Sequence, residues 1–142
     1  MLYLTRRETF NAAHKLHVAE WSEEKNRTVF GKCSNRNWHG HNYQLFVTVA
    51  GEPDPVTGFV MDAKVLSTII KEEVVSQVDH SNFNLDVAWM PEGVQPTTEN
   101  IVRLFWQRLE GRINATNASL YCIRLHETEN IYAEYYGPQG RK

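Results

Sequence analysis

Cysteine is scarce in this sequence: only Cys33 and Cys122 occur among its 142 residues. Two cysteines cannot build the disulfide framework of a small secreted domain. Residues 1–7 lack the long apolar core of a signal peptide, and no apolar stretch approaches the length of a membrane-spanning helix. We therefore expect a protein of the reducing cytoplasm with no membrane partner.

An excess of basic residues is also missing. The sequence has 15 Lys and Arg residues and 17 Asp and Glu residues, which gives a net charge of −2 and a pI near 6.3. This balance argues against a nucleic-acid partner held mainly through its phosphates. Internal repeats, low-complexity tracts and interdomain linkers are absent too, so we expect a single domain spanning residues 1–142.

The hydrophobic pattern predicts two strands in the first third of the chain. Residues 2–11 read as extended, and apolar residues alternate with polar ones from Tyr43 to Ala50. The polar stretch 17–37 between them is too long for a tight turn. Loops of this length are uncommon unless they are functional.

Two helices and two further strands complete the predicted elements. Asp62 is placed to cap the first helix, and Thr97 or Thr98 the second. Residues 120–127 and 131–136 read as strands joined by a short polar connection.

The resulting order is ββααββ, which predicts an α+β fold with a four-stranded antiparallel sheet and both helices on one face. The edges of such a sheet would be exposed, and apolar, aromatic-rich edge strands are prone to aggregate. We therefore expect copies of the chain to pair edge to edge in an oligomer.

Three histidines have the spacing of a catalytic metal site. Alternate residues of an extended strand point the same way, so His39 and His41 can meet one ion, with Gly40 keeping the backbone between them uncrowded. His14 ends the preceding strand, and antiparallel pairing would bring it near the other two. Three imidazoles leave the fourth position of a zinc ion open to water or substrate.

Cys33 stands shortly before this motif and has two possible roles. As a fourth ligand it would close the zinc site. Unligated beside the metal, it would have a depressed pKa and would serve as a base or nucleophile. The sequence leaves both roles open.

Asp79 and His80 follow the first predicted helix. A histidine there can simply complement the negative end of the helix dipole. Beside a zinc site and a thiol, the pair suggests a catalytic role instead, because a carboxylate can orient an imidazole and raise its basicity.

Several segments together resemble the 6-pyruvoyl-tetrahydropterin synthase family, in order and over nearly the whole chain. These segments are Phe10-Asn11-Ala12-Ala13-His14-Lys15-Leu16, Phe30-Gly31-Lys32-Cys33, His39-Gly40-His41-Asn42-Tyr43, Asp79-His80, Pro96-Thr97-Thr98-Glu99-Asn100 and Glu127-Thr128. The resemblance implies the tunnelling fold, with sheets joined side by side into a barrel, and a homohexamer made of two trimers.

The resemblance also implies an activity. The family converts 7,8-dihydroneopterin triphosphate to 6-pyruvoyl-tetrahydropterin with loss of triphosphate, using Zn²⁺ and no external redox cofactor. The matching positions imply zinc ligands at His14, His39 and His41. They imply a catalytic thiol at Cys33, partnered by Asp79 and His80.

Glu127 matches the family's pterin anchor, and a carboxylate can accept two parallel hydrogen bonds from a pterin's amino group and ring N–H. Thr97, Thr98 and Glu99 match a segment that helps to hold the pterin. Their alternative role is ordinary: a threonine cap and an acid in the first turn stabilise any helix.

The triphosphate needs positive charge, and the loop that delivers Cys33 carries Lys25, Arg27, Lys32 and Arg36. Trp38 departs from the family pattern, in which a small residue is common before the metal motif. A bulky indole there would narrow the mouth of the site and affect the choice of substrate.

Two other functions compete. A 6-carboxy-tetrahydropterin synthase of queuosine biosynthesis shares the fold, zinc and substrate but releases acetaldehyde. In that enzyme three residues typically lie between the cysteine and the His-Gly-His motif, whereas five lie between Cys33 and His39 here, which favours the pyruvoyl product. A non-catalytic zinc-binding or pterin-binding module is the second alternative.

Overall fold

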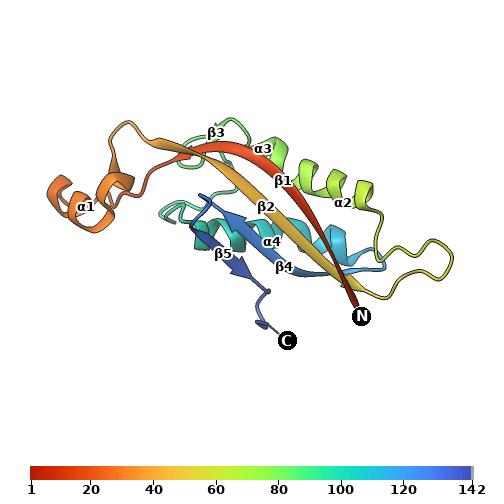
Figure 1. Ribbon diagram of the computed structural model, residues 1–142. Coiled ribbons are helices and arrows are strands. Elements are labelled where there is room, and N and C mark those ends of the chain that lie inside the picture. The colour runs from red at the N-terminus through yellow and green to blue at the C-terminus, as the bar shows by residue number, and fades with distance from the viewer. Residues whose placement is uncertain (142) are drawn as a thin grey trace.

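The computed structural model describes residues 1–141 as one layer of helices packed on a twisted sheet (Figure 1). The strands are β1 (Leu2–His14), β2 (His39–Gly51), β3 (Ser81–Asn82), β4 (Ser119–His126) and β5 (Tyr132–Tyr135). The helices are α1 (Glu23–Phe30), α2 (Ala63–Ile70), α3 (Ser76–Val78) and α4 (Thr98–Asn114). A 3₁₀ turn (Gly31–Ser34) follows α1, and a π-helical turn (Lys71–Val75) joins α2 to α3.

The sheet has the strand order β3-β1-β2-β4-β5. All neighbouring strands are antiparallel except β3, which pairs in parallel with the end of β1. The predicted α+β class is confirmed, but the four-stranded, purely antiparallel sheet is wrong. The sequence did not predict β3, because a strand of two residues is too short to show the alternation of polar and apolar residues.

The predicted count of two helices is also wrong, because α1 forms within the stretch read as a polar loop. Ser22 caps it by accepting a hydrogen bond from the Lys25 amide, and Gly31 ends it with a φ of 57°. Only Asn26 is buried in this helix. A polar helix has no apolar stripe, so its period is invisible in a hydrophobicity pattern.

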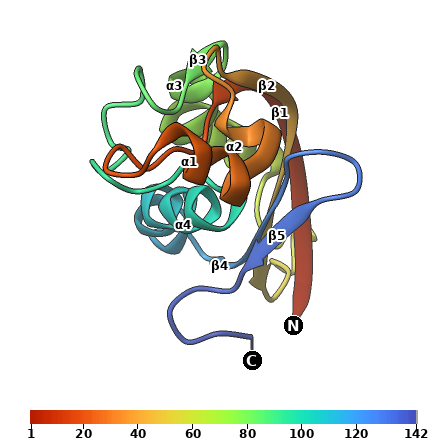
Figure 2. The same ribbon diagram turned by 90° about the vertical axis from the view of Figure 1, so that its left-hand side faces the viewer.

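The core lies between the sheet and helices α2 and α4, which cover the same face (Figure 2). β2 supplies Tyr43, Leu45 and Val47 to this core at alternate positions, all fully buried. Among residues 1–141, no helix covers the opposite face of the sheet (Figure 2). Within residues 1–141, no helix is long and apolar enough to cross a membrane.

Candidate metal and pterin site

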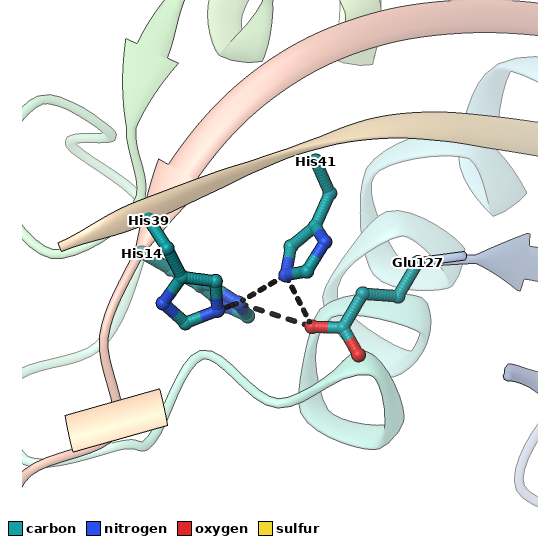
Figure 3. Close-up of side chains that lie close together, drawn as sticks. All are labelled: His14, His39, His41 and Glu127. Carbon is teal, nitrogen blue, oxygen red and sulfur yellow. Dashed lines mark hydrogen bonds and ion pairs between the residues drawn. The ribbon is translucent and has the colours of Figure 1, made fainter. Parts of the chain in front are cut away.

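The β1–β2 ladder brings the three predicted histidines together at one end of the sheet. His14 lies directly opposite His39 in the register, and His41 lies opposite Ala12. The Nε2 atom of His14 is 3.1 Å from Nε2 of His39 and 3.2 Å from Nε2 of His41. Figure 3 shows His39 and His41 on the same side of β2, as the alternation of strand residues predicts.

Gly40 is not needed to relieve crowding at this motif. A Cβ atom at Gly40 would lie 3.5 Å from the Ala12 carbonyl oxygen, which is an ordinary van der Waals distance. Its backbone also avoids the positive φ region that favours glycine. A larger residue would therefore also fit between the two histidines.

Glu127 completes the group from the end of β4. Its Oε1 atom lies 3.0 Å from Nε2 of His14 and 3.2 Å from Nε2 of His41 (Figure 3). One ligand atom from each of His14, His39, His41 and Glu127 lies within 4.8 Å of all the others. Sequence reasoning placed Glu127 at the substrate; it missed the closeness to the histidines, because the β2–β4 pairing is not readable from local spacing.

The donor set fits a transition metal. Ligands about 2.0–2.1 Å from a tetrahedral ion lie about 3.3 Å from one another. The contacts of His14 with His39, His41 and Glu127, and of His41 with Glu127, measure 3.0–3.2 Å. Burial is the largest cause that lowers the pKa of His39 and His41, so both imidazoles favour the neutral form that binds metal. The neighbouring histidines, His14 first, lower the pKa of Glu127, which favours the carboxylate.

Contacts behind His14 fix its orientation. His14 is 1% exposed, and its Nδ1 atom lies 2.8 Å from the Pro96 carbonyl oxygen. A carbonyl only accepts, so Nδ1 donates and Nε2 keeps its lone pair toward the site. A hydrogen bond from the ring nitrogen that does not bind the metal usually orients a metal-binding histidine. Sequence analysis missed the Pro96 carbonyl, since backbone acceptors leave no residue-type signal.

Cys33 lies in the 3₁₀ turn, half-buried beside the group. Its carbonyl accepts a hydrogen bond of 2.8 Å from the Leu16 amide, which ties the turn to the chain just beyond His14. The four-residue group that can hold a metal in residues 1–141 does not include Cys33. Burial, with the Glu127 charge second, raises the pKa of its thiol. The surrounding protein groups therefore raise the pKa of the thiol, whereas the sequence analysis expected a lowered pKa beside the metal.

Asp79 and His80 form a pair at the outer edge of β1. Asp79 Oδ1 accepts a hydrogen bond of 2.9 Å from the Asn11 amide, the largest cause that lowers its pKa. The Asp79 Oδ2 atom lies 3.0 Å from Nδ1 of His80. The His80 amide donates to the Asn11 carbonyl at 2.6 Å.

His80 is open to solvent and conformationally strained. Its side chain is 80% exposed, and its φ is 58°, in the region that favours glycine. Backbone strain of this kind concentrates at functional sites. Within residues 1–141, neither Asp79 nor His80 hydrogen-bonds to Cys33, so the structure does not unite the three predicted catalytic residues in one chain.

The predicted pterin-binding segment lies directly after Pro96. Thr97 caps α4 by accepting a hydrogen bond of 3.3 Å from the Asn100 amide, and Thr98 is buried. Glu99 stands in the first turn of α4. Thr97 therefore has the predicted capping role. The contact between the Pro96 carbonyl and His14 places the start of this segment beside the histidine group.

Two lysines near the site stack on tryptophan rings. Lys25 rests over the Trp21 ring, 4.1 Å from its centroid. Lys15, which sequence analysis did not single out, rests over the Trp38 ring at 4.6 Å. Trp38 itself adopts a φ of 60°, a costly conformation for a bulky residue immediately before a histidine of the group.

Comparison with known proteins defines the class of this fold and site. Residues 3–138 match the family model described as 6-pyruvoyl tetrahydropterin synthase. The 6-pyruvoyl tetrahydrobiopterin synthase of Poecilia reticulata is 43% identical over 136 residues, covering 95% of this chain and 90% of the relative. The human protein of the same name is 39% identical over 134 residues, covering 94% and 90%.

A solved structure agrees with these sequence matches. The Caenorhabditis elegans 6-pyruvoyl tetrahydropterin synthase superimposes with a TM-score of 0.87 at 34% identity, covering 96% of this chain and 95% of that one. This chain therefore belongs to the 6-pyruvoyl tetrahydropterin synthase family, and its α+β fold is the one found in that family. The resemblance noted from the sequence is confirmed.

Proposed function

We propose that residues 1–142 form one domain of a zinc-dependent 6-pyruvoyl-tetrahydropterin synthase, a carbon–oxygen lyase of the cytoplasm. It would convert 7,8-dihydroneopterin triphosphate to 6-pyruvoyl-tetrahydropterin with elimination of triphosphate. The observation that supports this proposal is the group of His14, His39, His41 and Glu127, which does not include Cys33. Family membership supports the pterin substrate.

His14, His39 and His41 are the residues that would hold the zinc ion, which leaves its fourth position open to the substrate. Glu127 lies beside them, with Oε1 3.0 Å from Nε2 of His14. When bound, zinc supplies a Lewis acid that acidifies the hydroxyls and the neighbouring C–H of the substrate side chain. The pKa directions of His39, His41 and Glu127 all favour the ligand form of each side chain. Glu127 can also accept two hydrogen bonds from the pterin's amino group and ring N–H.

Cys33 moves protons between carbon and oxygen in this proposal. The thiol must first lose its proton, and a positive charge beside it has to overcome the effects of burial and of Glu127. Asp79 accepts from Nδ1 of His80, which leaves Nε2 of His80 free to take or give a proton. The substrate's ring is reduced as its side chain is oxidised, so no external electron carrier is needed.

We propose that the site is completed between copies of the chain, in the homohexamer expected for the family. β3 pairs only with Ala12 and Ala13, so most of β1 is an open edge, and β5 forms the opposite edge. Leu2, Tyr3, Ile131 and Tyr132 are exposed at these edges. Edge pairing would cover them and bring a neighbour's residues to the exposed His80.

Mixing two inactive variants tests this assembly. We expect Cys33→Ala and His80→Ala chains, each inactive alone, to regain activity when unfolded and refolded together. Random mixing pairs an intact Cys33 with an intact His80 of a neighbour in about one quarter of sites, if the two residues come from different subunits. Recovery is measured as turnover per chain. No recovery above that of the separately refolded variants would contradict a shared site.

Product identification tests the reaction itself. The purified, zinc-loaded protein is incubated anaerobically with 7,8-dihydroneopterin triphosphate, and the pterin is identified by mass. The proposal predicts 6-pyruvoyl-tetrahydropterin and inorganic triphosphate. A carboxyl product with acetaldehyde would favour the queuosine-type synthase, and unchanged substrate would favour a binding module.

A further inference from the structure

Residues 15–18 join His14 of the histidine group to the region that carries Cys33, and they form neither helix nor strand. Figure 1 shows that α1 projects beyond the ends of β1 and β2, away from α2 and α4. The 3₁₀ turn that contains Cys33 directly follows α1. The position of the thiol therefore depends on how residues 15–18 and this turn are held to the rest of the fold.

Two side-chain amides hold residues 15–18 to the body of the fold. Asn84 Oδ1 accepts a hydrogen bond of 2.9 Å from the Lys15 amide, and Asn84 Nδ2 donates to the Lys15 carbonyl at 3.0 Å. Gln95 Oε1 accepts from the His17 amide at 3.0 Å, and Gln95 Nε2 donates to the His17 carbonyl at 2.8 Å. A carboxamide carries a donor and an acceptor, so each side chain satisfies both backbone groups of one residue, as a neighbouring strand would.

Both of these clamping residues are themselves anchored. The Asn84 backbone amide donates to Asn82 Oδ1 of β3 at 2.8 Å. The Gln95 carbonyl accepts a hydrogen bond of 2.9 Å from Nδ2 of Asn100, which lies in the first turn of α4. The two clamps therefore connect residues 15–18 to β3 and to the start of α4.

The other two residues of the segment hold the Cys33 region. The Leu16 amide donates to the Cys33 carbonyl at 2.8 Å. Asn26 of α1 accepts from the Val18 amide at 2.8 Å and donates to the Val18 carbonyl at 2.9 Å. Asn26 is 1% exposed, so water does not compete for these bonds. The segment thus binds the body of the fold at its first and third residues and the Cys33 region at its second and fourth.

We propose that Gln95 and Asn84 are positioning residues, which fix the Cys33 thiol beside the histidine group by holding residues 15–18. This inference rests on the proposed function, because the thiol is the proton carrier of that reaction. Irregular backbone regains conformational freedom when the bonds that order it are removed. A misplacement of about 1 Å can cost about 10²-fold in rate, so the loss of a clamp acts on turnover.

Hydrogen exchange at the Leu16 amide of the zinc-loaded protein tests the positioning without turnover. Gln95→Ala leaves both backbone groups of His17 without their partner, so we expect the neighbouring Leu16 amide to exchange at least about tenfold faster. Asn84→Ala is expected to act in the same direction but more weakly, because Asn84 is exposed and water can replace its bonds. An exposed side chain is also removed without unfolding the chain. Unchanged exchange in both variants would overturn the proposal.

Steady-state kinetics separate positioning from a general structural role. In Gln95→Ala we expect kcat to fall about 10–100-fold and KM to stay within about threefold. Bound zinc per chain should not change, because the histidine group is held by the β1–β2 ladder. Loss of zinc, or a raised KM with kcat retained, would overturn the positioning role.

Asn114→Ala is the matched control. Asn114 Oδ1 accepts a hydrogen bond of 2.8 Å from the Leu120 amide, and Asn114 ends α4 at the opposite end from Gln95. This variant also removes an amide that holds backbone, but remote from residues 15–18. We expect unchanged exchange at Leu16 and unchanged kcat. Equal effects in Asn114→Ala and Gln95→Ala would overturn the proposal.

The failure of this proposal can be told apart from the failure of the proposed function. If the unchanged chain forms the product and Gln95→Ala keeps its kcat, the positioning role is overturned and the proposed function stands. If the unchanged chain forms no product, the proposed function fails, and exchange at Leu16 alone decides whether the clamps fix the Cys33 turn.

Discussion

Replacing Cys33 by alanine is expected to lower turnover by about 10²–10⁴-fold, the usual contribution of a positioned acid–base group. The same change should leave the metal in place, because Cys33 lies outside the four-residue group. Folding should also persist, since the side chain is only half-buried and the contact with Leu16 uses the Cys33 carbonyl. Turnover and bound zinc per chain are measured on the same preparation.

Cys122→Ala is the matched control for this experiment. Cys122 lies in β4, and its side chain is directed away from Ile123 and Leu125 of the core. We expect its loss to leave turnover within about twofold, because the mechanism assigns it no proton. Loss of zinc in Cys33→Ala would instead show that the thiol is a ligand. Unchanged turnover with zinc retained would exclude an essential role for the thiol.

Replacing His41 by alanine is expected to weaken zinc binding by well over about 100-fold, more than the usual loss of a group behind a ligand. Turnover should fall with zinc affinity. Excess zinc should restore little of the turnover, because one of the zinc ligands is missing. His41 contacts both His14 and Glu127, so its removal also frees a carboxylate that it helped to hold. Zinc affinity is measured by competition with a chromophoric chelator.

His126→Ala is the control for a general loss of histidine. His126 lies next to Glu127 but stacks on Tyr132 at 4.7 Å between centroids, outside the four-residue group. It should keep the zinc affinity of the unchanged chain. Equal weakening in both variants would contradict the assignment of the metal site to His14, His39 and His41.

The histidine cluster could be predicted because strand geometry is local and regular. Two histidines at alternate positions face the same way, and antiparallel pairing of the strands that end at His14 and begin at His39 leaves little freedom. The second helical region was also readable, since buried residues such as Ile101, Phe105 and Leu109 repeat at the helical period. Patterns of this kind depend only on neighbours in the sequence.

Features set by long-range contacts could not be predicted in the same way. Glu127 reaches the histidines only because β4 pairs with β2, and His80 lies at the sheet edge because its amide meets the Asn11 carbonyl. Helix α1 was missed because its polar sequence buries only Asn26. The raised pKa of Cys33 follows from burial and from Glu127, neither of which spacing reveals.

X-ray absorption at the zinc edge of the loaded protein tests the central claim most directly. The proposed site predicts a shell of nitrogen and oxygen neighbours at about 2.0–2.2 Å and no sulfur. A sulfur neighbour at about 2.3 Å would place Cys33 on the metal and contradict the account. The Cys33→Ala spectrum is the internal reference, and it should match that of the unchanged chain.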